Sequence, residues 1–446
     1  MATVVEQSKP VDHVSRYVSR YTAKRGRFVS EPSWLTAARD EALARFTASG
    51  FPTTRDEDWR FTPVSPIVTT PFVDAEAGHV DANRLAPHLF GDAVAAELVF
   101  VNGRFSAGLS RTENLPAGLE VGSLAQLIAT RPEALEPWLT TGAANQGSAF
   151  TSLNTAFLED GAFVEISRDA VIDRPIHVVF YSTGGGAPAV AYPRLLVVAG
   201  EHSEGSLIET YAGSEGTTYL TNTVAEFFVG HRAILNHYRL QRESLSAYHV
   251  GTQVVRTGRE TGCQSHNFVL GGAIARNDVS AVLGGQGGDT TLNGLYLAGG
   301  TQLVDTHTTI DHALPHNGSH ELYKGILGGK SRGVFNGKII VRQDAQKTDA
   351  KQTNKALLLS DGAQIDTKPQ LEIFADDVKC THGATVGQLD PEMLFYLQAR
   401  GIALADARAL LILGFAGDVV NRVTFAPLRE RLDEVVRRRV QEIQVQ

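Results

Sequence analysis

The chain has few cysteines, and this scarcity excludes several kinds of site. Cys263 and Cys380 are the only two in 446 residues. Two cysteines cannot build a disulfide framework, nor a four-cysteine zinc or iron-sulfur site within one chain. A metal site in this protein would therefore need histidines or a second chain.

Long apolar runs are also absent. The first residues, MATVVEQSKPVDH, carry Glu6 and Asp12 without an apolar core, so no secretory signal is expected. No run of about 18 apolar residues is present to span a membrane, and we predict a cytoplasmic protein. The formal charge of -8 argues against nucleic acid as a partner of the whole chain. Most lysines lie between Lys324 and Lys379, which suits a solvated face or a local acidic partner.

Glycine, in contrast, is abundant, with 43 residues in 446 against a usual share of about 7%. Downstream of residue 153 the sequence consists of short, β-branched segments bounded by Gly, Pro or Asp, which predicts strands. Gly-Gly pairs begin at Gly271, Gly284, Gly299 and Gly328, at intervals of 13, 15 and 29 residues. One strand and one turn about every 14 residues fits stacked β-coils in which every second strand returns to the same face. Hairpins would give a similar spacing, but Asn-Gly turns are scarce.

Helical patterns precede this strand region. Apolar residues recur at helical spacing between Pro32 and Gly50, which predicts one helix. A second helix is expected over Ser123 to Trp138, with a break near Pro132. We therefore expect residues 1–150 to form an N-terminal helical and mixed domain.

The pattern becomes helical again after Asp390. This residue, followed by proline, predicts a helix start, and Gly401 predicts its end. A second apolar helix is expected from about Asp406 to Phe415, and the last segment carries one apolar stripe typical of an amphipathic helix. We expect a β-solenoid core at 151–389 and a C-terminal helical domain at 390–446.

The run from Leu327 to Ser331, Leu-Gly-Gly-Lys-Ser, is similar to part of a phosphate-binding loop. It lacks the required register, because Lys324 stands where the first glycine is needed. The residues that follow are typical of a strand, whereas phosphate is held at the start of a helix. We expect no ATP to bind to this chain.

The densest group of histidines contains His307, His312, His316 and His320. With neighbouring aspartates they would suit zinc or iron. A proline and an Asn-Gly pair between them indicate a loop, however, so they need not converge. Solvated or hydrogen-bonded histidines are the favoured interpretation.

Each cysteine has a histidine close by. Cys263 and His266 would lie on opposite faces of a strand, so Cys263 is predicted to be a buried structural residue. Cys380 and His382 would lie on one face, about 7 Å apart. There a thiolate and an imidazole can share a soft metal or form a nucleophile pair. Two ligands do not complete a metal site, so another group would have to do so.

A dense series of motifs occupies residues 300–422. It comprises RGVFNGKIIV at 332–341, AQKTDA at 345–350, QTN at 352–354, LLLS at 357–360, TKPQLE at 367–372, DDVKCTHGAT at 376–385 and LFYLQARG at 394–401. Together with RDEDWRFT at 55–62, these runs resemble the SufB/SufD family of the SUF iron-sulfur cluster assembly system. Gly383 after the histidine, and the lack of a cysteine-rich segment, resemble the SufD branch more than SufB.

This resemblance implies a mainly β fold, with a right-handed parallel β-helix between helical N-terminal and C-terminal domains. It implies a noncatalytic scaffold subunit that pairs with SufB through the β-helix ends and docks the ATPase SufC through its C-terminal domain. His382 matches a family histidine at the SufB interface, where a transient iron-sulfur cluster is held, and Cys380 matches a neighbouring cysteine. The residues expected to contact SufC are Phe395, Tyr396, Arg400 and Phe415.

Two alternatives stay open at this point. The first is a SufB-like paralogue, which would share the same scaffold. The motifs also do not indicate whether a flavin takes part in cluster assembly. A β-solenoid enzyme acting on polysaccharide would need converging acidic and basic residues and a secretion signal, which the sequence does not display. Exposed β-helix ends also predict a homodimer of the isolated chain when SufB is absent.

Overall fold

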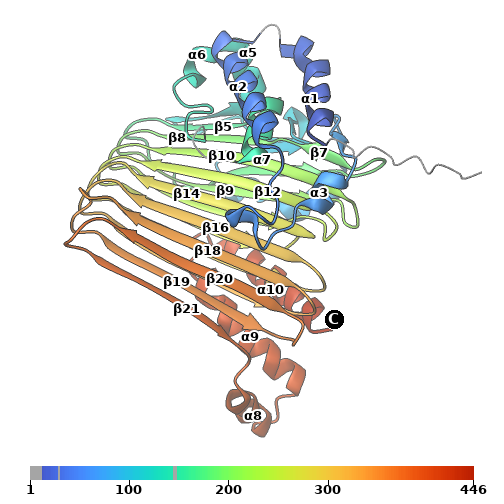
Figure 1. Cartoon of the computed structure of the whole chain (residues 1–446), viewed down its shortest axis with the longest axis vertical. Helices are drawn as coiled ribbons and strands as arrows, with labels where there is room; N and C mark the ends of the chain where they lie inside the picture. The colour runs from blue at the N-terminus through green and yellow to red at the C-terminus, as the bar shows by residue number, and fades with distance from the viewer. Residues whose placement is uncertain (1–12, 29–30, 144–147, 446) are drawn as a thin grey trace, which may run out of the picture.

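Two mainly parallel sheets face each other and form a solenoid that occupies most of the structure (Figure 1). The computed structural model describes residues 13–28, 31–143 and 148–445. From its free end, the first sheet contains β20 (Gln364–Ile373), β18 (Arg332–Val341), β16 (Leu303–His312), β14 (Ile274–Leu283), β12 (Tyr248–Thr257), β10 (Tyr219–Val229), β8 (Arg194–Ala199), β5 (Gly161–Ile166) and β4 (Leu119–Ser123), with β7 (Ala189–Ala191) and β1 (Val73–Asp74) beside β10. The second contains β21 (Lys379–Gly387), β19 (Asp349–Leu358), β17 (Gly318–Leu327), β15 (Asp289–Ala298), β13 (Gly262–Val269), β11 (Ile234–Arg242), β9 (Glu204–Gly213), β6 (Ile176–Ser182), β2 (Ala96–Val101) and β3 (Arg104–Phe105).

Successive strands of the solenoid alternate between the two sheets. Leu303 of β16 lies opposite Arg332 of β18, 29 positions later, and Gly318 of β17 lies opposite Asp349 of β19, 31 positions later. One coil thus takes two strands and about 30 residues, and the predicted repeat of about 14 residues is half a coil. The prediction of a mainly β fold with a parallel solenoid core is confirmed.

The glycine pairs mark two different corners of the coil. Gly271, Gly299 and Gly328 follow strands of the second sheet, whereas Gly284 follows a strand of the first. The intervals along the sequence are uneven because Gly284 lies at the other corner. At Gly329, φ is +64° and an added Cβ would lie 2.8 Å from a backbone nitrogen of the preceding coil, so this turn requires glycine.

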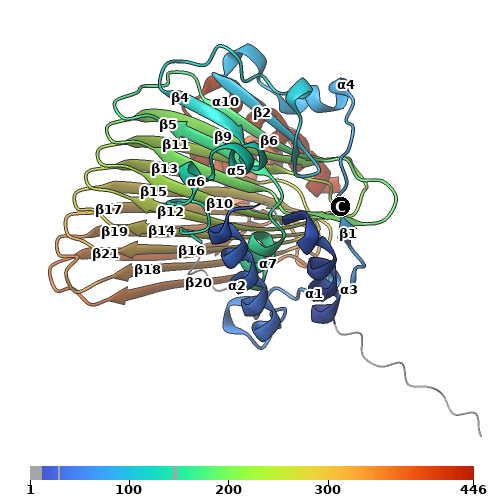
Figure 2. The same ribbon diagram turned by 90° about the horizontal axis from the view of Figure 1, so that it is seen from above.

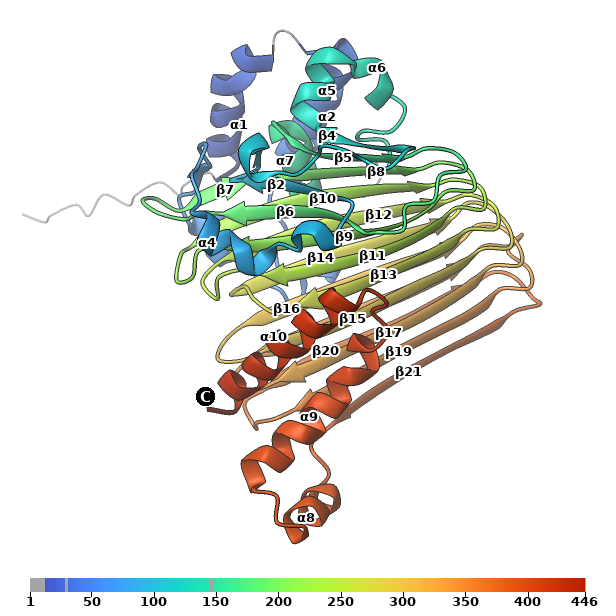
Figure 3. The same ribbon diagram turned by 180° about the vertical axis from the view of Figure 1, so that it is seen from behind.

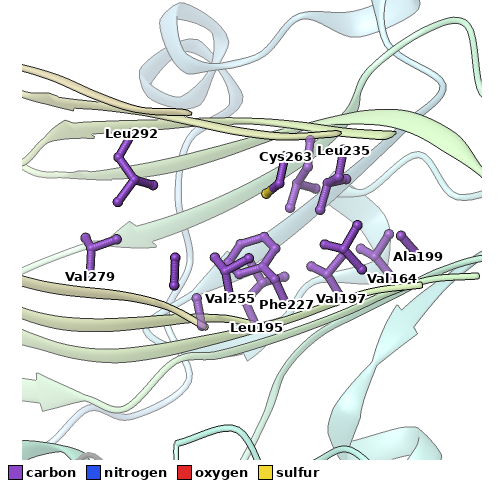
Figure 4. Packing of buried hydrophobic residues seen from close by; sticks show 14 of the residues in the cluster. Val164, Leu195, Val197, Ala199, Phe227, Leu235, Val255, Cys263, Val279 and Leu292 are labelled. Carbon is purple, nitrogen blue, oxygen red and sulfur yellow. The ribbon is translucent and has the colours of Figure 1, made fainter. Parts of the chain in front are cut away.

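The inward faces of the two sheets enclose an apolar core (Figure 4). Val197 and Phe227 of the first sheet pack there with Leu292 and Cys263 of the second. Cys263 is 2% exposed, and its sulfur points into this core in Figure 4. The predicted burial of Cys263 is therefore confirmed.

Polar side chains also occupy the interior. His237 lies with Nε2 3.0 Å from a carboxylate oxygen of Glu209 and Nδ1 2.9 Å from the hydroxyl of Ser265. Glycine makes room for one bulky interior side chain: an added Cβ at Gly294 would lie 2.1 Å from the ring of Tyr323. Part of the glycine surplus thus accommodates bulky interior side chains.

Most N-terminal helices cover the outer face of the first sheet, whereas α4 packs on the second sheet (Figure 2). The helix predicted between Pro32 and Gly50 is α2, and the broken second helix is the pair α5 and α6, so both predictions are confirmed. The same region supplies β2 and β4, which pair with β6 and β5. The helices are α1 (His13–Lys24), α2 (Ser33–Ser49), α3 (Ser65–Thr69), α4 (Ala82–Leu85), α5 (Leu124–Thr130), α6 (Pro132–Leu135) and α7 (Ala149–Phe157).

The C-terminal helices are α8 (Pro391–Ala399), α9 (Leu404–Val420) and α10 (Ala426–Val445). In Figure 3, α9 and α10 lie on the outer face of the second sheet, and α8 projects away from it. The predicted apolar stripe packs against that sheet, because Leu428, Leu432 and Val436 are buried with Tyr238 and Leu295. In the described part of the chain, no helix combines the length and apolar character that a membrane span requires. The domain boundaries at 150 and 390 stay a prediction.

Candidate functional site

The free end of the solenoid exposes the last strand of each sheet. Within the described residues, β21 pairs only with β19, and β20 pairs only with β18. Backbone groups on the outer edges of these strands are therefore open to further strands. Apolar side chains are exposed at the same end: Phe374 is 64% exposed, Val386 46% and Ile373 40%.

Cys380 and His382 lie on the inward face of β21. Cys380 is opposite Ala350 and His382 is opposite Gln352, both of which are buried in the interior. Cys380 is half-buried and packs against the apolar core, whereas His382 is exposed at the open end. The structure thus brings these two predicted site residues onto one face.

The surroundings of Cys380 keep its thiol protonated. Burial raises the pKa of the Cys380 thiol above its ordinary value, the nearby Asp349 carboxylate raises it further, and a backbone hydrogen bond at Ala350 opposes this increase. An activated nucleophile needs a lowered pKa, so this environment favours a ligand that loses its proton when a metal binds. Sulfur and imidazole donors suit iron. No group of three or more His, Cys, Asp or Glu among the described residues is placed to hold a metal ion, so this pair needs further ligands.

A polar column that sequence reasoning missed lies directly beneath His382. Glu321, Gln352 and His382 occupy matching inward positions on β17, β19 and β21. The amide Nε2 of Gln352 donates a hydrogen bond to Glu321 Oε2, at 2.7 Å. Burial raises the pKa of Glu321 to about 7. In the sequence, Gln352 and Asn354 alternate with exposed lysines, which indicates that both amides point inward. This pattern does not show that Glu321 is the carboxylate opposite Gln352.

Three of the four residues predicted to contact SufC lie together, with Phe395 and Tyr396 on α8 and Arg400 at its C-cap. The guanidinium carbon of Arg400 is 4.4 Å from the ring centre of Tyr396. Phe395 is 73% exposed and Tyr396 56%, and no residue of α8 is buried. Met393 and Leu404 add exposed apolar surface that sequence reasoning did not single out. This group forms an unpartnered apolar surface on the projecting helix.

Phe415 lies elsewhere, on α9 against the second sheet. Lys324 of β17 donates a hydrogen bond from Nζ to the backbone oxygen of Phe415, at 2.9 Å, and lies 4.3 Å from its ring centre. Lys324 also forms an ion pair with Asp418. Phe415 therefore anchors α9 to the solenoid, and its predicted contact with SufC stays a prediction.

The histidine cluster of the sequence is dispersed in the structure. His307 lies on the outer face of β16 with Nε2 3.2 Å from Asp305. His312 is buried at the end of that strand, where burial lowers its pKa to about 4. His316 is in a turn and His320 lies on the outer face of β17. They do not converge, which agrees with the favoured interpretation as hydrogen-bonded side chains.

Two other motifs have structural roles. The Leu327–Ser331 segment contains the last residue of β17 and the turn to β18, so a strand follows it, as predicted. Cys263 and His266 point to opposite faces, as predicted: burial raises the pKa of Cys263 to about 12, and the ring of His266 stacks on Tyr238 at 5.2 Å.

The sequence matches two family models over most of its length. Residues 180–415 match the SufBD core domain of SUF system FeS cluster assembly, and residues 12–178 match the SufBD protein N-terminal region. The chain is 34% identical to an iron-sulfur cluster assembly SufBD family protein of Synechocystis, over 91% of each chain. It is 31% identical to the iron-sulfur cluster assembly protein SufD of Escherichia coli, over 91% of this chain and 93% of the relative. Identity to SufD of Bacillus subtilis is 26%, over 92% and 95%.

Proposed function

Because the chain belongs to the SufBD family of iron-sulfur cluster assembly proteins, we propose that it is a SufD-type scaffold subunit and not an enzyme. Two of its relatives carry the name SufD, which supports this branch over a SufB-like paralogue. The observation that carries the proposal is the placement of Cys380 and His382 on the inward face of the edge strand β21. In this proposal a transient cluster is the substrate, held where the open end meets SufB in the cytoplasm.

The open end supports pairing with a second solenoid. Strands added to β20 and β21 would continue both sheets and satisfy the open backbone groups. Phe374 and Ile373 would become buried in the joint, and the interior face that carries Cys380 and His382 would be closed off from water. SufB would then supply the remaining ligands. When SufB is absent, a second copy of this chain would occupy the same end.

Within that joint, His382 offers a ring nitrogen and Cys380 offers its sulfur to iron. Cys380 is protonated before iron binds, and the charge of a bound metal would lower the pKa of a coordinating thiol. The thiol would therefore release its proton to solvent as the bond to iron forms, before the joint closes. Asp349 raises the pKa of the Cys380 thiol and so disfavours its thiolate. The thiol would therefore take up a proton again when the cluster leaves. These two residues would hold the cluster only while the partner is in place.

The C-terminal helices support docking of SufC. The exposed aromatic side chains of α8 supply an apolar anchor. A movement of α8 would pass to α9 and then, through Lys324 and Phe415, to β17, which is two strands from β21. ATP hydrolysis in SufC would in this way open or close the joint between the solenoids.

The cluster site is tested by reconstituting the chain with SufB and SufC. His382→Ala should abolish bound iron and sulfide while the complex still elutes at its full size, because the exposed imidazole supports no packing. Thr381→Ala, on the outward face of the same strand, is the matched control and should load normally. Full cluster loading by His382→Ala would refute the assignment.

The SufC surface is tested by substitution rather than deletion, because removing residues 390–446 would uncover the sheet that α10 covers. The double variant Phe395→Ala, Tyr396→Ala should lose SufC in a pull-down and keep SufB. Phe374→Ala, at the open end, should show the reverse pattern, keeping SufC and binding SufB more weakly. Retention of SufC by the double variant would contradict the proposal.

A further inference from the structure

The outer face of the second sheet carries exposed lysines next to the open end of the solenoid. Lys351 and Lys355 lie on the outward face of β19, and Lys379 begins the edge strand β21. A carboxylate oxygen of Asp349 is 3.6 Å from Lys351 Nζ, which is too far for a hydrogen bond. Among the described residues, no ion pair involves Lys355 or Lys379. This face, here called the lysine face, therefore carries an excess of positive charge.

Most other lysines near the open end are already neutralised. Apart from Lys330, which is in the turn before β18, each of them pairs with a carboxylate: Lys324 with Asp418, Lys338 with Glu372, Lys347 with Asp377, and Lys368 with Glu57. The lysine-rich part of the sequence thus leaves its unpaired charge chiefly on the outer face of β19 and β21. An acidic partner that reaches the open end would meet this charge.

The edge strand is flat beside the lysines. After Lys379, its outward positions are Thr381, Gly383, Thr385 and Gly387. An added Cβ at Gly383 or Gly387 would have no atom within 4 Å, and neither glycine has a positive φ. No contact with the described residues therefore requires glycine at these two positions. Glycine weakens a strand and often marks a place where another backbone or a ligand approaches closely, so this flat row leaves space for groups from outside the chain.

The spacing of the strands allows the lysines to reach an added strand. A strand paired with β21 would lie two strand spacings from β19, about 10 Å away. Lys351 is opposite Thr381 and Lys355 is opposite Thr385, with Gly383 between them, so no large side chain blocks either path across β21. The long, flexible lysine stem can cross this row toward a carboxylate that extends from the added strand. Carboxylates on the outward face of such a strand would therefore meet the lysine face.

A second copy of this chain does not supply such carboxylates. Its β21 carries Lys379 and no acidic residue on the outward face, so two β21 strands side by side would bring like charges together. Its β20 carries Asp366 and Glu372 on the outward face, but these already pair with Arg332 and Lys338. Charge therefore favours a different chain over a second copy at this end.

We propose that Lys351, Lys355 and Lys379 select the partner at the open end. They favour a solenoid whose pairing strand carries carboxylates on its outward face, and they disfavour a second copy of this chain. This inference rests on the proposed function, in which SufB pairs at this end. Backbone hydrogen bonds and the apolar side chain of Phe374 stabilise any added strand, whereas the lysine face discriminates between strands by charge.

The test compares the full-length wild type with the triple variant Lys351→Gln, Lys355→Gln, Lys379→Gln by analytical ultracentrifugation. At about 0.1 M salt the variant should bind SufB about tenfold more weakly, because three surface ion pairs are lost. At about 1 M salt the two proteins should bind SufB equally, because exposed charges are screened. Self-association should change in the opposite direction. The isolated variant should self-associate more tightly than the wild type, and added salt should strengthen self-association of the wild type.

The matched control removes three exposed positive charges from turns of upstream coils, Arg168→Gln, Arg232→Gln and Arg259→Gln, and should bind SufB as the wild type does. Circular dichroism verifies that each variant is folded. The lysine variant should retain SufC in a pull-down, and loss of SufC with normal SufB binding would overturn the choice of partner.

Equal SufB binding by the wild type and the lysine variant at low salt would overturn the inference while leaving pairing at the open end intact. Unchanged or weaker self-association of the variant would overturn the discrimination against a second copy. Absence of SufB binding by the wild type at both salt concentrations would refute the proposed function, and the inference with it.

Discussion

Replacing Glu321 by glutamine should stabilise the metal-free chain at alkaline pH. Burial raises the pKa of this carboxyl from its ordinary value of 4.5 to about 7. The side chains that face it are Thr308, Leu292, Gln352 and Tyr323, none of which is charged. Among the residues that the structure describes, no cation lowers the pKa of this carboxyl.

The size of the effect follows from proton linkage. Between pH 4.5 and 7 the unfolded chain has lost the Glu321 proton while the folded chain keeps it, so the free energy of unfolding falls as the pH rises. At about 1.4 kcal/mol per pH unit, the loss reaches about 3 kcal/mol by pH 8. Glutamine does not titrate, so Glu321→Gln should match the wild type near pH 4.5 and exceed its stability by about 3 kcal/mol at pH 8.

Urea unfolding followed by circular dichroism at both pH values, with chelator present, measures this difference. Glu372→Gln controls for the loss of a surface carboxylate and should keep the pH dependence of the wild type. A Glu321→Gln variant that is less stable than the wild type at pH 8 without metal would refute the reasoning.

Two further predictions concern the anchored helix and the cysteines. Lys324→Met should destabilise the docking of α9 by about 2 kcal/mol, because it removes a buried charged hydrogen bond to Phe415. Amide exchange in α9 should accelerate, whereas Lys351→Met on the exposed face of β19 should have no effect, and unchanged exchange in the Lys324 variant would contradict the anchor. Iodoacetamide should modify one thiol of the native chain, Cys380, and two after denaturation, because Cys263 is 2% exposed. The reaction rate of Cys380 should keep rising above pH 9, and a plateau below pH 8 would be inconsistent with its raised pKa.

Local patterns were sufficient to predict several elements. Pro32 and Gly50 bracket α2, Asp390 accepts a hydrogen bond from the Glu392 backbone at the start of α8, and the two-residue spacing places Cys380 and His382 on one face. Each of these features depends only on residues that are close in sequence. Helix capping and strand alternation are short-range properties, so a single sequence is enough to predict them.

Alignment between coils could not be predicted in the same way. The step from Leu303 to its partner is 29 residues and the step from Gly318 is 31, so no fixed repeat indicates that Glu321 lies opposite Gln352. The position of Phe415 also depended on contacts that are distant in sequence, since Lys324 is 91 residues away. The positions of Glu321 and Phe415 are thus determined by turn lengths and packing rather than by local pattern.

The sequence by itself determined the solenoid, the helices that precede and follow it along the chain, the family, and the placement of Cys380 and His382 on one strand face. Periodicity and motifs depend only on residues that are close in sequence. Only the tertiary structure decided that the strand with this pair is an open edge. It also decided that Phe415 lies apart from Phe395, and that buried oxygens gather beneath His382. These features arise from the stacking of coils about 30 residues apart, which brings together side chains that no local pattern relates.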